Sequence, residues 1–140
     1  MSSLREQYGL NETAVIELKD ANDEAMIGAD GKQCTVTVFA PGTKQANKAR
    51  ARDINVATER VQRKGKTKIT GEEYGVDRVD YGVMVTQSVS DNLASEFAGL
   101  TGPDLFRKLY SDPDLGTLIL DQVYTEQQKK ENFTKGSTGS

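Results

Sequence analysis

The chain has 140 residues, of which 36% are hydrophobic and 28% charged, and its formal net charge is -3. A chain of this length has room for one domain around a single core, so two independent domains are not expected. Residues 1–10 are polar and no apolar run approaches the roughly 18 residues of a membrane span, so we expect neither a signal peptide nor a membrane segment. The lone cysteine, Cys34, cannot form an internal disulfide, which is typical of a protein of the reducing cytoplasm.

The first elements in chain order are strands. Apolar and polar residues alternate over residues 14–19 and again over 34–39, and this period of two predicts strands with one buried face. The stretch 20–23 is rich in turn-forming residues, and the Asp-Gly pair at 30–31 favours a tight hairpin because Gly tolerates positive φ. We therefore expect a three-stranded meander with a short middle strand near residues 25–28.

Two longer helices are expected next. Pro41-Gly42 ends the sheet, and Thr43 can cap a helix that reaches Lys64 and presents a stripe consisting mostly of alanine. After a basic linker, the sequence from Thr70 to Glu73 matches a capping box. It predicts a second helix that ends at about residues 86–90, although glycine and β-branched residues weaken its propensity.

Two shorter amphipathic helices complete the predicted elements. Thr101-Gly-Pro-Asp begins a short helix with an apolar face, and Asp112 caps another helix that runs from Pro113 to about Lys130. The order of elements predicts an α+β fold with a small N-terminal antiparallel sheet, a β-meander, followed by a cluster of about four α-helices. This single domain spans 14–133, between a flexible N-terminus (1–13) and a flexible C-terminal tail (134–140).

No set of residues in the sequence predicts catalysis, a cofactor or a metal ion. The absence of histidine removes the commonest general base and metal ligand. Residues 28–32 lack the spacing of a phosphate loop, and residues 20–31 lack the glycine and final glutamate of a calcium loop. Cys34 lies in phase with Val36 and Val38, so a buried thiol is favoured over a nucleophile. We expect a protein that is not an enzyme.

Charge is strongly segregated along the chain. Residues 44–68 hold nine basic residues against two acidic ones, whereas the rest of the chain holds nine basic against 19 acidic. Such a segment can bind an acidic protein surface or nucleic acid, and it can equally be the solvated face of a helix, which is the favoured interpretation. Few aromatic residues accompany it, so stacking on single strands has no support and nucleic acid is the less favoured partner.

The candidate partner-binding residues come from two regions. The C-terminal helix can present an apolar face to the groove of a partner, although packing in the core is the favoured role for that face. The candidates of the basic segment and of the C-terminal helix are Lys48, Arg52, Arg60, Arg63, Lys64, Leu118, Ile119 and Val123.

Several short stretches together carry a family resemblance. They are residues 34–49 (CTVTVFAPGTKQANKA), 60–68 (RVQRKGKTK), 109–116 (LYSDPDLG), 121–123 (DQV) and 132–133 (NF). Over about residues 14–133 the chain resembles phage tail proteins of the tail assembly chaperone type. The resemblance implies a protein of the bacterial host cytoplasm that binds the tape measure protein, keeps it soluble and helps recruit tail tube protein.

The resemblance carries over no functional residues, because no residue-level motif for tape measure binding matches this sequence. It implies no cofactor and no membrane contact, and it leaves a homo-oligomer open. Two alternatives stand beside it: a minor structural tail protein of the virion, and a nucleic-acid-binding module that uses residues 44–68.

Overall fold

The structure is a computed structural model that describes residues 9–64 and 71–134. The side chains of residues 57, 60–64 and 71–77 also lie outside the description. The predicted flexible ends, the basic linker and the capping Thr70 therefore fall largely or wholly on residues that are not described.

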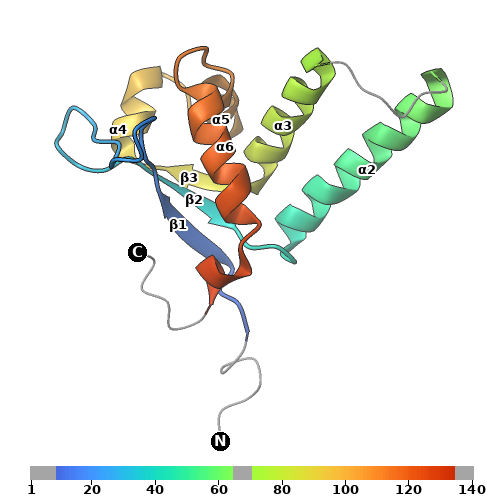
Figure 1. Cartoon of the computed structure of the whole chain (residues 1–140), viewed down its shortest axis with the longest axis horizontal. Coiled ribbons are helices and arrows are strands. Elements are labelled where there is room, and N and C mark those ends of the chain that lie inside the picture. The colour runs from blue at the N-terminus through green and yellow to red at the C-terminus, as the bar shows by residue number, and fades with distance from the viewer. Residues whose placement is uncertain (1–8, 65–70, 135–140) are drawn as a thin grey trace, which may run out of the picture.

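The α+β fold is confirmed, with a three-stranded antiparallel sheet and a cluster of helices (Figure 1). The strands are β1 (Thr13–Glu17), β2 (Thr35–Phe39) and β3 (Thr86–Val89), in the order β1-β2-β3. The helices are α2 (Lys44–Lys64), α3 (Gly71–Val85), α4 (Asp91–Ala94), α5 (Gly102–Tyr110) and α6 (Gly116–Gln127), with 3-10 turns η1 (Ser95–Phe97) and η2 (Lys130–Phe133).

The third strand does not come from the segment that the sequence indicated. Residues 25–28 make only isolated bridges, Lys19 with Ala25 and Ile27 with Gln33. The strand that pairs with β2 is β3, which starts where α3 ends, so the expectation that this helix reaches residues 86–90 is wrong. A hydroxyl stabilises the junction, because Thr86 Oγ1 donates to the carbonyl of Gly82 at 2.6 Å.

The helices cover one face of the sheet, and the core lies between the two layers (Figure 1). The alternation predicted for the strands is confirmed, since Ile16, Val36 and Val38 point into the core whereas Val15 is 47% exposed on the other face. The apolar face of α5 and the fully buried Phe133 of η2 join the same cluster. One core therefore connects the sheet to the C-terminal helices.

Turns form where the sequence predicted them. The Asp-Gly hairpin is confirmed, with Gly31 at φ 79° and Asp30 Oδ1 accepting a hydrogen bond from the amide of Lys32 at 3.0 Å. Asp112 stabilises the start of the last helix, because its Oδ2 accepts from the amide of Leu115 at 2.8 Å. The helix itself starts at Gly116 and ends at Gln127, inside the predicted bounds.

Residues 10–13, which the sequence assigned to a flexible N-terminus, are paired. Leu10 forms an antiparallel bridge with Thr134, and the amide of Asn11 donates to the carbonyl of Phe133 at 2.6 Å. The ends of the described domain therefore lie side by side. Among the helices of the described segments, none is long and apolar enough to cross a membrane.

Candidate partner-binding surfaces

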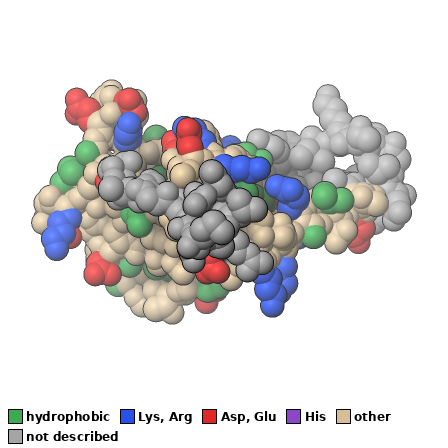
Figure 2. Space-filling view, turned by 90° about the horizontal axis from the view of Figure 1, so that it is seen from below, with side chains coloured by type: hydrophobic (Ala, Val, Ile, Leu, Met, Phe, Trp, Pro, Cys, Tyr) green, Lys and Arg blue, Asp and Glu red, His purple; other side chains and the backbone are tan. Residues whose placement is uncertain are grey.

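Helix α2 is the main exposed element of the basic segment. It packs chiefly on α3, and its buried side chains include the alanines Ala46 and Ala49. Lys48 and Arg50 are exposed, and Ile54 is 59% exposed. Figure 2 shows basic and hydrophobic side chains on the side of the molecule where Figure 1 places α2. This surface combines positive charge with an exposed apolar side chain.

Arg52, a predicted partner-binding residue, is engaged inside the molecule. Its Nη2 lies 2.5 Å from Asp80 Oδ2 on α3, and Arg107 of α5 binds the other oxygen of the same carboxylate. The Asp80 side chain is only 14% exposed. Asp80 therefore joins α2, α3 and α5, and Arg52, whose side chain is 34% exposed, is held in this cluster of ion pairs. The side chains of Arg60, Arg63 and Lys64 lie outside the described part.

The predicted partner-binding face of the C-terminal helix is mostly core. Ile119 and Val123 are 0% exposed, so neither can contact a partner, and the apolar periodicity that suggested such a face is accounted for by packing. Leu118 is half-buried and borders a surface groove. Of the three apolar candidates, only Leu118 is accessible.

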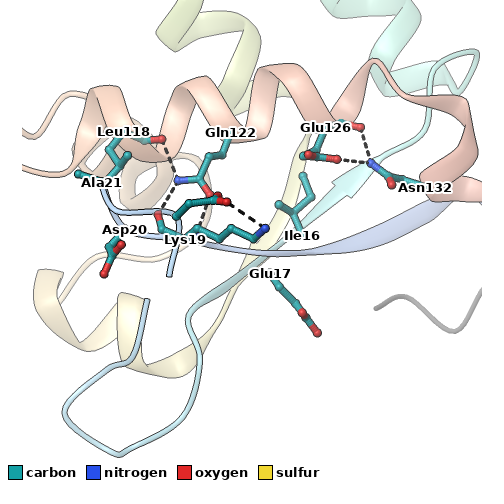
Figure 3. A pocket seen from close by; sticks show the side chains of 10 residues that line it. Ile16, Glu17, Lys19, Asp20, Ala21, Leu118, Gln122, Glu126 and Asn132 are labelled. Atoms are coloured by element: carbon teal, nitrogen blue, oxygen red, sulfur yellow. Dashed lines mark hydrogen bonds and ion pairs between the residues drawn. The ribbon is translucent and has the colours of Figure 1, made fainter. Parts of the chain in front are cut away.

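The groove lies between β1 and α6 and has a volume of about 490 Å³ (Figure 3). Its lining combines residues of the first strand and turn with residues of the last helix and η2. Four carboxylates border it against one ammonium group: Glu17, Asp20, Asp23 and Glu126 against Lys19. The groove is therefore acidic, in contrast to α2.

Gln122 holds the two walls of the groove together (Figure 3). The amide of Lys19 donates to Gln122 Oε1 at 2.8 Å, and Gln122 Nε2 donates to the carbonyl of Lys19 at 2.8 Å. The carboxamide thus binds both backbone groups of Lys19, as a neighbouring strand would. Sequence patterns give no sign of this contact, because 103 positions separate the two residues.

Glu126 is fixed at the other end of the groove. Asn132 Nδ2 donates to its Oε2 at 2.7 Å, and Lys129 Nζ lies 3.0 Å from its Oε1. Partial burial opposes ionisation, but the hydrogen bonds from Asn132 and Lys129 outweigh it and lower the pKa of Glu126. Glu126 is therefore charged at neutral pH, and the ammonium group of Lys129 compensates its charge.

Cys34 occupies a core position, as its phase with the neighbouring valines predicted. Cys34 is buried and immediately precedes β2. Desolvation is the main cause that raises the pKa of its thiol, and the negative charges of Asp30 and Glu96 raise it further. Across the described ranges, no group of three or more Cys, Asp or Glu side chains is placed to hold a metal ion.

Comparisons of the chain with known protein families, with curated proteins and with solved structures found no match.

Proposed function

We propose that this protein is a non-enzymatic phage tail assembly chaperone, which acts in the cytoplasm of the bacterial host, binds the tape measure protein and helps recruit tail tube subunits. The proposal starts from the resemblance of residues 34–49, 60–68 and 109–133 to proteins of that type. Some of the described residues in these stretches lie in the core, among them Val36, Leu109 and Phe133. Buried residues bear on the fold, so the binding function needs support from the surface.

The exposed face of α2 is the observation that carries the proposal. Lys48 and Arg50 flank a helix surface on which Ile54 is 59% exposed, and the helix packs chiefly on one neighbour. A tape measure protein is a long helical client whose apolar stripes need cover before assembly. A helix that offers an apolar side chain among basic ones suits an amphipathic client helix that bears acidic residues.

Co-expression with the tape measure protein encoded beside this gene tests the proposal. We expect much more of the client in the soluble fraction, co-purifying with this chain. The double variant Ile54→Glu/Lys48→Glu should lose most of this effect, because it replaces the exposed apolar side chain and one flanking basic side chain by negative charge. A matched control is Lys108→Glu/Lys130→Glu, which changes two exposed lysines on other elements.

Absence of both solubilisation and co-purification would overturn the chaperone function. Detection of the chain in purified virions would then favour a minor structural tail protein. Steeply salt-dependent binding of DNA or RNA, lost when Arg60, Arg63 and Lys64 are replaced, would favour the nucleic-acid-binding alternative.

A further inference from the structure

Strand β1 lies at the edge of the described sheet, and two of its residues, Val15 and Glu17, are exposed. In an antiparallel ladder, alternate residues direct both the N–H and the C=O towards the same neighbour. The amide of Leu18 donates to Cys34 and the carbonyl of Glu12 accepts from Ala40, so the even-numbered residues face β2. Thr13, Val15 and Glu17 therefore direct their backbone groups away from the sheet. Within the described ranges, none of these groups has a hydrogen-bond partner.

Both ends of this open edge are closed by the chain itself. At one end Asn11, the preceding outward residue, donates to the carbonyl of Phe133. At the other end Lys19, the following outward residue, is bound on both backbone groups by Gln122. Proteins commonly cover edge strands in this way, because an open edge pairs with other chains. Between these two ends, no described residue pairs with the outward backbone groups of Thr13, Val15 and Glu17, and we call these three residues the window.

We propose that this window accepts an extended, basic segment of another protein as a fourth strand of the sheet. Strand addition of this kind takes affinity from backbone hydrogen bonds and specificity from alternate side chains. The groove between β1 and α6 gives solvent access along this edge, and its walls carry Leu118 and Gln122 (Figure 3). One set of side chains of the added strand would lie in the groove, and the other set beside the exposed Val15.

The negative charge of the groove favours a basic segment as the added strand. Lys129 pairs with Glu126, which leaves Glu17, Asp20 and Asp23 against Lys19 along the groove. Lysine or arginine side chains on the added strand therefore gain attraction from it. A second copy of this chain, paired through its own β1, would bring an identical acidic groove to the contact. Repulsion between the two grooves disfavours that pairing, and a basic partner segment is the better fit.

A short peptide tests the inference directly. The probe is a capped peptide of about seven residues that alternates lysine with valine, and its counterpart has glutamate in place of lysine. We expect the lysine peptide to shift the amide resonances of Thr13, Val15 and Glu17 and to protect them from hydrogen exchange. Its affinity should fall with added salt, and the glutamate peptide should bind at least about tenfold more weakly.

Val15→Pro is the decisive variant. The N–H that it removes has no partner inside the described part of the molecule, and proline is tolerated on edge strands where the N–H faces solvent. The variant should therefore keep its fold and lose the peptide. Val15→Thr keeps the N–H and should bind like the original chain. If Val15→Pro fails to fold, Glu17→Lys replaces it and should weaken the lysine peptide severalfold.

Three results would overturn the inference. They are an unshifted β1 in millimolar peptide, equal binding by a folded Val15→Pro chain, and a peptide-free dimer that Val15→Pro abolishes, which would assign the edge to a second copy. The peptide measurements do not involve the tape measure protein. They therefore succeed or fail independently of the proposed function.

Discussion

At the scale of single residues, Asp80 connects three helices. It accepts from Arg52 of α2 and Arg107 of α5 while it is itself part of α3, and its side chain is largely buried. Removal of one partner from a partly buried ion pair leaves the other charges desolvated without compensation. Half of the Arg107 side chain remains in solvent, which limits the energy of that bond.

Asp80→Ala should therefore lower the free energy of unfolding by about 1–2 kcal/mol. Urea unfolding followed by circular dichroism measures the change. Glu24→Ala, which removes an equal charge from an exposed turn, is the control and should change stability by less than about 0.5 kcal/mol. Equal effects of the two variants would show that Asp80 does not connect the helices energetically.

Tyr110 makes stability depend on pH in the alkaline range. Burial raises the pKa of its hydroxyl well above the ordinary value of 10.0, although the hydrogen bond with Thr86 acts in the opposite direction. Burial also raises the pKa of Tyr81 and Cys34. A raised pKa in the folded state contributes stability below the ordinary pKa, and this stability is lost as pH rises above it.

The free energy of unfolding should therefore fall between about pH 8 and about pH 10.5. Tyr110→Phe should be less stable than the original chain at the lower pH, by about 1 kcal/mol for the lost hydrogen bond. Its stability should fall less steeply with pH, because one titrating group is gone. Urea midpoints across this range measure both effects, and parallel curves for the two proteins would refute the assignment to Tyr110.

At the scale of elements, local patterns predicted some parts of the fold and not others. Strand β2 and helices α5 and α6 follow from periodicity and capping that a short window of sequence contains. Strand β3 does not, because its four residues continue directly from a helix and include Gln87 and Ser88. Only pairing with β2, about fifty positions away, makes this segment a strand.

Local patterns likewise predicted some features of the candidate partner-binding surfaces and missed others. Lys48 is exposed, as its predicted partner-binding role requires, whereas Ile119 and Val123 are buried in the core and Arg52, whose side chain is 34% exposed, is engaged by Asp80. Arg52 pairs with an aspartate 28 positions away, which no local pattern reveals. The groove was not predicted, because its walls come from opposite ends of the chain.

Gln122 offers a test of how α6 holds the edge of β1. Gln122→Ala removes both hydrogen bonds to the backbone of Lys19 and should cost about 1–2 kcal/mol of stability. The amide of Lys19 should exchange with solvent faster than in the original chain, as measured by hydrogen exchange. Thr125→Ala, on an exposed position of the same helix, should leave that amide unchanged. Unaltered protection in Gln122→Ala would contradict the role given to the carboxamide.

At the scale of the whole molecule, one core connects the N-terminal sheet to the C-terminal helices. Phe133 is fully buried among residues from both regions, next to the site where the ends of the domain pair. A domain organised in this way should unfold as one unit, because no layer keeps a core of its own.

Phe133→Ala should cost about 3–5 kcal/mol through the lost apolar contact and the cavity left behind. Unfolding should remain a single transition, with the loss of helical signal and the change in tyrosine fluorescence coinciding. Leu100→Ala, at a partly exposed site, should cost much less. Two separated transitions in Phe133→Ala would show that the sheet and the helices fold independently.

The pairing of Leu10 with Thr134 also decides how the domain responds to mechanical force. The bridge is antiparallel, so the chain enters and leaves the domain at the same end of it. A pull on residues 9 and 134 in opposite directions therefore peels the bridge open, starting at Leu10 and proceeding to the Asn11–Phe133 bond. Hydrogen bonds broken in succession resist less than a ladder sheared all at once. The domain should therefore begin to unfold at low force when it is pulled by its two ends.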